Sequence, residues 1–84
     1  MFKPDVADHP SVHGLVVQAR DHLAAGDDKG AARLLTDAVY HTRDPEIGQQ
    51  VRELASQGLG RAGRFGKGRW EEIIRVADLR APQP

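Results

Sequence analysis

The sequence predicts an all-α domain built from four helices that pair as two antiparallel hairpins. Apolar residues recur at helical spacing in four segments of the 84-residue chain, and no segment alternates as a β-strand does. Capping residues, glycines and prolines separate these segments. We expect helices over about 11–25, 28–42, 45–57 and 69–80, within one domain that spans residues 10–81.

The first helix is predicted by one continuous apolar stripe. Either Asp8 or Ser11 can cap it, and Pro10 suits its first turn. Gly26 is expected just beyond its C-terminus, at the position where helices favour glycine. Residues 1–9 lack the periodicity and are expected to form a flexible N-terminal arm. The stripe consists of Val12, Leu15, Val16, Ala19 and Leu23.

The second helix is expected to follow at once, because Asp27 is a preferred capping residue. So short a connection predicts a tight antiparallel hairpin with the first helix. Gly30 in the first turn costs up to about 1 kcal/mol relative to alanine, and we therefore expect a close contact there. The predicted buried face consists of Ala31, Leu34, Leu35, Ala38 and Val39.

The third helix has clear start signals and an ambiguous end. Asp44 is a capping acid, and Pro45 suits the first helical position. Gly58 and Gly60 are expected to end the helix near residue 57. A continuation towards Phe65 would need close helix packing to offset the cost of interior glycines. The apolar stripe of this helix is Ile47, Val51, Leu54 and Ala55.

The fourth helix is predicted by its apolar face and by its charges. Glu71 and Glu72 lie in its first turn and Arg80 near its end, an arrangement that the helix dipole favours. The apolar face consists of Trp70, Ile73, Ile74 and Ala77.

The stretch from Gly58 to Trp70 differs from the rest of the chain. It contains five of the nine glycines and four cations, with no acid. We expect residues 58–68 to form a basic, glycine-rich loop, which could contact phosphates while aromatic rings stack on unpaired bases. The alternative is that both aromatic residues belong to the helical core. The candidate residues for binding nucleic acid or another anion are Arg61, Arg64, Lys67, Arg69, Phe65 and Trp70.

More specific chemistry is not predicted. The GxGxxG letters at 58–63 follow a predicted helix rather than a strand, so the dinucleotide fingerprint does not apply. A Walker A motif would need glycine at Arg61 and a hydroxyl residue at Gly68. His9 and His13 lack the glutamate of an HExxH site. Because the chain has no cysteine and its serines have no neighbouring base, we expect no enzyme activity, no cofactor and no metal site.

Composition predicts a soluble cytoplasmic protein. The N-terminus lacks the apolar region of a signal peptide, and no apolar run reaches the ~20 residues of a membrane span. Residues 1–50 carry five cations and eight acids (net −3), and residues 51–84 carry seven and four (net +3). This polarity favours head-to-tail association or an anionic partner. We also expect self-association, because small domains without disulfides often gain stability as oligomers.

The first hairpin resembles a tetratricopeptide-type helical repeat. Gly26 and Asp27 match the turn between its helices, and residues 68–74 (GRWEEII) resemble a second such turn and helix. The two glycines, Gly26 and Gly68, are 42 residues apart, whereas that repeat has a period of about 34. The chain is also similar to short, uncharacterised helical proteins of actinobacteria, which implies a bacterial protein but does not indicate an activity. The tightly packed positions of the repeat are matched by Ala31, Leu35 and Ala38.

These patterns together predict a small protein-interaction module that binds itself or another protein. The tetratricopeptide-type resemblance implies a scaffold of this kind. Nucleic-acid binding through the glycine-rich stretch is the alternative.

Overall fold

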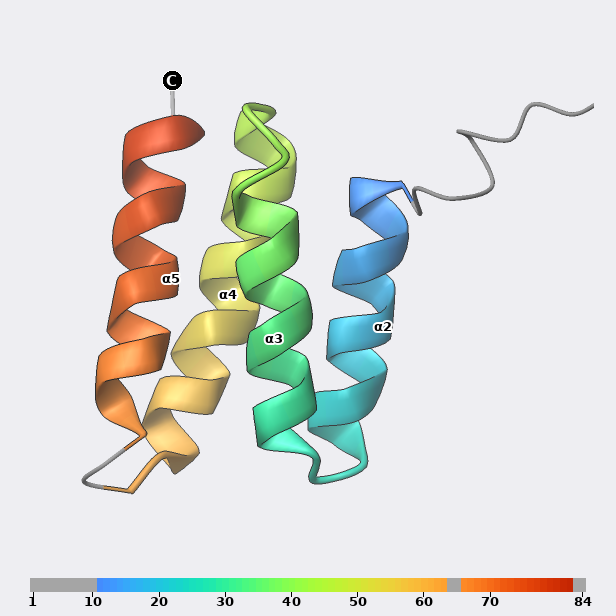
Figure 1. The fold of residues 1–84 in the computed structure, drawn as a ribbon, viewed down its shortest axis with the longest axis vertical. Coiled ribbons are helices and arrows are strands. Elements are labelled where there is room, and N and C mark those ends of the chain that lie inside the picture. Colours follow the sequence, from blue (N-terminus) through green and yellow to red (C-terminus); the bar gives the residue numbers. More distant parts are fainter. Residues whose placement is uncertain (1–10, 64–65, 83–84) are drawn as a thin grey trace, which may run out of the picture.

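The computed structural model describes residues 11–63 and 66–82, and within these residues the fold is all-α (Figure 1). The expected N-terminal arm, Asp8 and Pro10 lie outside the described residues. The helices are α2 (Val12–Ala24), α3 (Asp28–Val39), α4 (Pro45–Arg61) and α5 (Lys67–Arg80).

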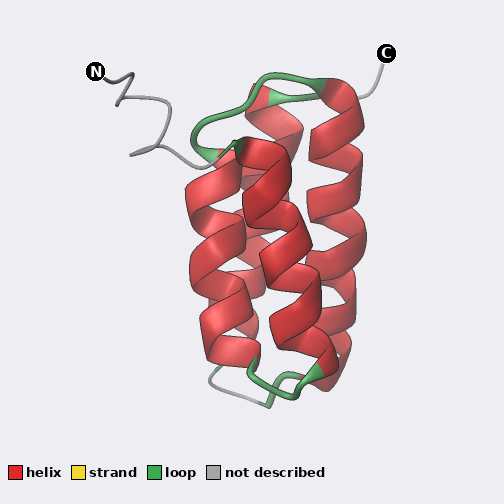
Figure 2. Cartoon of the chain, turned by 90° about the vertical axis from the view of Figure 1, so that its right-hand side faces the viewer, coloured by secondary structure: helices red, strands yellow, loops and turns green. Residues whose placement is uncertain are grey.

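Successive helices run in opposite directions, so α2 and α3 form one antiparallel hairpin and α4 and α5 form the other (Figure 1). The connections lie at the two ends of the bundle (Figure 2). The helices stack in two layers, with α2 against α4 and α3 against α5, and α3 also contacts α4. In the described part of the chain, no Cα atom of α2 lies within 8 Å of α5. The predicted pair of packed hairpins is therefore confirmed.

The predicted N-terminal caps form as expected. The Ser11 hydroxyl accepts a hydrogen bond from the Gly14 backbone N–H at 3.0 Å. The Asp44 carboxylate accepts one from the Glu46 N–H at 2.9 Å, with Pro45 at the start of α4. Each cap satisfies a backbone donor that has no partner within the helix.

The turn between α2 and α3 is a Schellman motif. Gly26 adopts a positive φ of 86°, a conformation that glycine takes without steric cost. Its N–H donates to the Leu23 carbonyl at 3.1 Å, and the Asp27 N–H donates to the His22 carbonyl at 2.8 Å. The Asp27 carboxylate then caps α3 by accepting from the Gly30 N–H at 3.0 Å. One short segment thus ends α2 and starts α3.

The apolar stripes predicted from the sequence form the core. Four of their members, Val12, Leu34, Ile47 and Ile74, are partly buried and pack against its edge. The remaining members are buried, and Val76 and Ala32 join them. The largest fully buried side chains are Leu35, Ile73, Val39 and Val51.

The expected end of the third helix near residue 57 is wrong. Helix α4 continues through Gly58 and Gly60 to Arg61. The reason is close packing, because a Cβ atom at Gly58 would lie only 2.4 Å from Cζ2 of Trp70. Glycine thus allows the indole to lie directly against the α4 backbone. The predicted loop over 58–68 is correspondingly shorter and lies between α4 and α5.

Two other helix boundaries also differ from the expectation. Helix α3 ends at Val39 rather than near residue 42. Thr42 is buried, and its hydroxyl accepts a hydrogen bond from the Asp44 N–H at 3.1 Å, a local turn that replaces helical hydrogen bonding. Helix α5 begins at Lys67, two residues early, with Gly66 as its N-cap.

The other end of the α4–α5 hairpin is also closely packed. A Cβ atom at Gly48 would lie 2.7 Å from the Ala81 Cβ. Beside this contact, Nη1 of Arg52 lies 3.1 Å from Oδ1 of Asp78. Glycines therefore bring α4 close to α5 near both ends of the hairpin.

Candidate functional site: a cationic groove between α3 and α5

The residues proposed from the glycine-rich stretch have different environments. Trp70 is only 4% exposed, so its indole is part of the core and is not open for stacking on a base. Arg61 forms an ion pair with Asp28. Lys67 and Arg69 are exposed on the first turn of α5. Arg64 and Phe65 lie outside the described residues.

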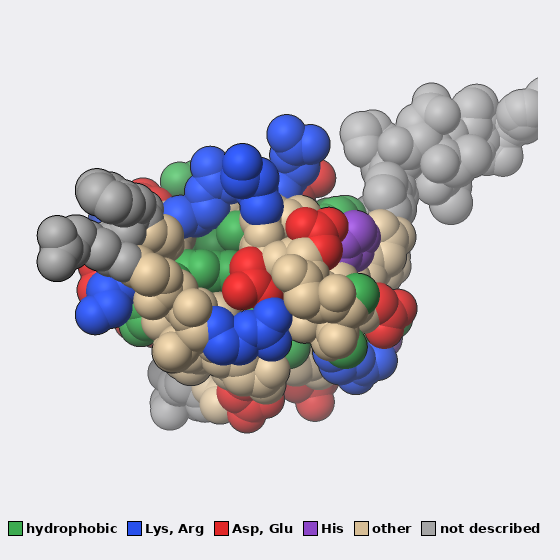
Figure 3. Space-filling view, turned by 90° about the horizontal axis from the view of Figure 1, so that it is seen from below, with side chains coloured by type: hydrophobic (Ala, Val, Ile, Leu, Met, Phe, Trp, Pro, Cys, Tyr) green, Lys and Arg blue, Asp and Glu red, His purple; other side chains and the backbone are tan. Residues whose placement is uncertain are grey.

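Arg69 shares a surface hollow with two cations of α3. It lines one pocket with Lys29 and Arg33, and a neighbouring pocket places Lys29 and Arg69 beside Ala32 and Trp70. We call Lys29, Arg33 and Arg69 the cationic cluster. Figure 3 views the molecule from the end at which α2 turns into α3. Lys and Arg side chains gather along one edge of this view, with apolar surface beside them. None of the three forms an ion pair with any residue that the structure describes.

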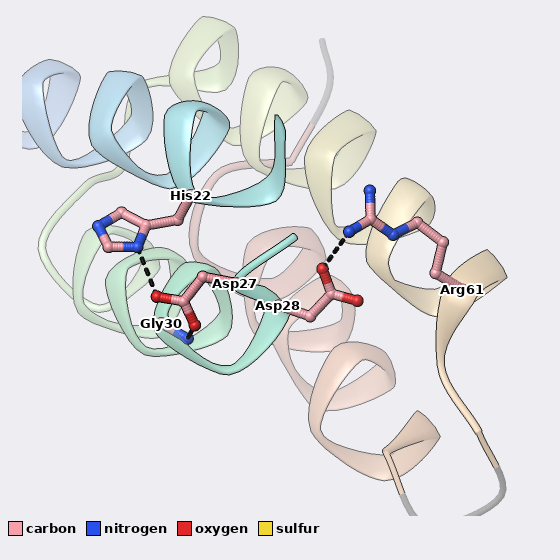
Figure 4. Close-up of polar contacts among 5 residues, drawn as sticks. All are labelled: His22, Asp27, Asp28, Gly30 and Arg61. Carbon is pink, nitrogen blue, oxygen red and sulfur yellow. Dashed lines mark hydrogen bonds and ion pairs between the residues drawn. The ribbon is translucent and has the colours of Figure 1, made fainter. Parts of the chain in front are cut away.

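Two carboxylates that line these pockets, those of Asp27 and Asp28, are engaged with other partners. Oδ2 of Asp27 lies 2.7 Å from Nδ1 of His22, and the same carboxylate caps α3 (Figure 4). Asp28 points the other way, to Arg61 of α4 (Figure 4). Asp27 and Asp28 thus line the same pockets as the cationic cluster, but each carboxylate is bonded to a residue outside the cluster.

The absence of a side chain at Gly30 leaves room for the Asp27 carboxylate and the His22 ring. A Cβ atom at Gly30 would lie 2.4 Å from Oδ2 of Asp27 and 3.0 Å from Nδ1 of His22. This confirms the predicted close contact at Gly30. The Gly30 N–H, and after it the His22 side chain, lower the pKa of the Asp27 carboxyl below its ordinary value. Asp27 is thus held as a carboxylate by the turn itself.

Beyond the cationic cluster the hollow continues along α3 and α5. This part of the hollow has a volume of about 480 Å³. It ends at Tyr40, which is 48% exposed. We call the whole depression the α3/α5 groove. Its lining residues are Asp27, Lys29, Gly30, Arg33, Thr36, Asp37 and Tyr40 on the α3 side, and Arg69 and Glu72 on the α5 side.

The α5 side continues past the groove with a paired charge and an exposed apolar residue. Nε of Arg75 donates to Glu72 at 3.2 Å, and this hydrogen bond raises the pKa of the Arg75 guanidinium. Leu79, two helical turns after Glu72, is 69% exposed. Nε of Arg80 donates to the Val39 carbonyl at 3.2 Å, which fixes the C-terminal ends of α5 and α3 side by side.

Sequence reasoning found Arg69 but missed Lys29 and Arg33. Their spacing of four residues does place them on one face of the second helix, next to its predicted buried face. That signal was available, but it does not show which helix lies opposite. Only the packing of α3 on α5 brings Arg69 to the same hollow.

No described helix combines the length and the apolar character that crossing a bilayer requires. Among residues 11–63 and 66–82, no three His, Asp or Glu side chains gather as a metal site would need. The chain matches no model of a known protein family, and comparison with curated proteins and with solved structures gives no significant match.

Proposed function

We propose that the chain is a small protein-interaction module that binds through the α3/α5 groove and also associates with itself. The observation that supports this most is the exposed Tyr40, in a groove whose cations form no ion pair with the described residues. Tyrosine and arginine are enriched among the residues that contribute most to binding energy at protein interfaces.

The two-layer order of the helices supports the same proposal. Stacked helical hairpins of the tetratricopeptide type contact their neighbours in this way, and such stacks commonly serve as binding scaffolds. The separation of α2 from α5 distinguishes the arrangement from a closed four-helix bundle, in which the first and last helices would meet.

Nucleic-acid binding through the glycine-rich stretch has less support. Two of its six candidate residues are engaged within the fold, since Trp70 is buried and Arg61 pairs with Asp28. A fluorescein-labelled single-stranded oligonucleotide, followed by anisotropy, tests it. Contact with about four phosphates would give a slope of about −3 in log K against log salt.

Site-specific photo-crosslinking tests the proposed function. A photoreactive amino acid replaces Tyr40 in the groove, and a matched variant carries it at Gln57, which is exposed on α4. We expect adducts from the Tyr40 position and few from the Gln57 position. Mass spectrometry identifies each adduct as a second copy of the chain or as another protein. Equal labelling at both positions, or none at either, would count against the groove as an interface.

A further inference from the structure

We propose that the α3/α5 groove recognises a short acidic segment of a partner protein, whose carboxylates contact the cationic cluster and whose apolar side chain lies against Tyr40. This inference rests on the proposed function and adds the chemistry of the partner. It follows from the order of charges and apolar surface along the groove.

The cationic end suits carboxylates. Lys29 and Arg33 lie one turn apart on α3, and Arg69 faces the same hollow from α5. Arginine binds a carboxylate with two parallel hydrogen bonds, and such charge-assisted bonds are stronger than neutral ones. Asp27 lines the same pocket, but its carboxylate is bonded to the Gly30 N–H and to the His22 ring. Because the three cations have no ion pair with any described residue, a ligand carboxylate would not have to displace an internal acid.

The floor beneath Lys29 and Arg69 is partly apolar, with the Asp28–Arg61 ion pair beside it. Ala32 is 1% exposed and Trp70 is 4% exposed, and both line the hollow beside Lys29 and Arg69. Apolar walls reduce the local dielectric screening, so a carboxylate here is attracted more strongly than at an open surface.

The opposite end offers an apolar contact. Tyr40 and Leu79 are the large hydrophobic residues that the described part of the chain leaves exposed. Both lie towards the C-terminal ends of their helices, which the Arg80–Val39 hydrogen bond holds together. An apolar side chain of the ligand would cover Tyr40 and remove this surface from water.

The separation of the two ends sets the spacing in the ligand. Arg33 and Tyr40 are seven positions apart in the sequence, a rise of about 10 Å along the helix axis. An extended chain advances about 3.3 Å per residue. An extended ligand would therefore place its apolar residue about three positions from its acid.

The middle of the groove favours such a segment over nucleic acid. Asp37 and Glu72 line it between the cations and Tyr40. A sugar-phosphate backbone running along the groove would bring phosphates close to these two carboxylates. A peptide can carry its acids at one end only and present neutral residues to Asp37 and Glu72.

A random dodecapeptide phage library, selected on the full-length chain, tests the inference. We expect selected peptides to be enriched in Asp and Glu with an apolar residue about three positions away. Binding of a synthetic selected peptide should weaken about tenfold or more in Arg33→Glu and in Arg69→Glu, since each reversal replaces an attraction with a repulsion. Tyr40→Ala should also weaken it. Arg20→Glu, the same charge change at an exposed position of α2, should leave the affinity unchanged.

The outcomes separate the two levels of the proposal. Peptides that lack acids but still depend on Tyr40 would overturn the acidic-segment inference and leave the groove as an interface. Peptides whose affinity changes in none of the groove variants would overturn both.

Two other occupants are tested in parallel. A thymidine 20-mer whose binding is lost in Arg69→Glu, with no peptide selected, would show that the ligand is nucleic acid. A dimer in light scattering that dissociates in Arg69→Glu but not in Arg20→Glu would show that a second copy fills the groove. Either result would overturn the inference. Circular dichroism of each variant confirms that it keeps its helical content.

Discussion

Replacing Gly58 with alanine should destabilise the bundle, whereas the same change at Gly60 in the same helix should stabilise it. At Gly58 the new Cβ atom would lie 2.4 Å from Cζ2 of Trp70 and 2.5 Å from both Cε2 and Cη2. An ordinary contact between carbon atoms is about 3.5 Å or more, so the indole would have to move by about 1 Å. Trp70 is only 4% exposed and is enclosed by the core, so this movement disturbs its neighbours.

The magnitude follows from two opposing contributions. Glycine to alanine within a helix stabilises by about 1 kcal/mol, and this gain is common to both positions. Overpacking a closely packed core costs about 1–3 kcal/mol, and this cost applies only at Gly58 because a Cβ atom at Gly60 meets nothing within 4 Å. The two variants should therefore differ by about 1–3 kcal/mol, with each kcal/mol shifting Tm by about 4–8 °C in a domain of this size.

Urea titration followed by circular dichroism at 222 nm measures the difference directly. A double-mutant cycle with Trp70→Leu, made in the stabilised Gly60→Ala background, identifies the source of the cost. If the indole causes it, Gly58→Ala should be much less harmful once the ring is gone. Equal stability of Gly58→Ala and Gly60→Ala would refute the reasoning, because it would mean that Trp70 does not lie against the α4 backbone.

Three further predictions concern the first turn and the contact between the hairpins. Gly26 has a φ of 86°, so Gly26→Ala should lower the free energy of unfolding by about 1–2 kcal/mol in urea titration, and an unchanged midpoint would contradict the left-handed turn. The fold lowers the pKa of Asp27 from its ordinary 3.8, so its carboxylate stabilises the native state above that value and ceases to do so as pH falls through the native pKa. The stability advantage of the wild type over Asp27→Asn should therefore shrink as the pH is lowered below 3.8, and a constant difference would argue against the shift. Arg61 and Asp28 have side chains 46% and 34% exposed, so a double-mutant cycle should give a coupling of about 0.2–1 kcal/mol that weakens with salt; a coupling well above this range would indicate a buried pair.

Most of the fold could be predicted from local signals. Ser11, Asp27 and Asp44 cap their helices through side-chain hydrogen bonds, and such caps are recognisable in a sequence. The apolar stripes likewise identify the buried faces, because helical periodicity reports which side of a helix avoids water.

The end of α4 could not be decided locally. The low helix propensity of Gly58 and Gly60 indicates a loop, and only the contact with Trp70 favours helix. Gly58 and Trp70 belong to one stretch of sequence, but they lie on two different helices in the fold, and helix propensity does not report a contact between helices.

The candidate groove was predictable only in part, for a similar reason. Arg69 belongs to an obvious run of cations, but its neighbours Lys29 and Arg33 lie about 40 residues earlier in the chain. Arg61 lies 33 positions after Asp28, the acid with which it pairs. The run of cations in the sequence therefore indicated a basic surface near residue 69. The packing of the hairpins determines which of these cations form ion pairs within the fold and which can bind a ligand.

The separation of α2 from α5 has a consequence for how the molecule comes apart. Helices α3 and α4 each contact three others, whereas α2 and α5 each contact two. Helix α2 can therefore detach while α5 keeps its contacts with α3 and α4, and α5 can detach while α2 keeps its own. Amide protons of α2 and α5 should then exchange with solvent sooner than those of α3 and α4, so the stack frays inward from its edges and its central pair is the last to open.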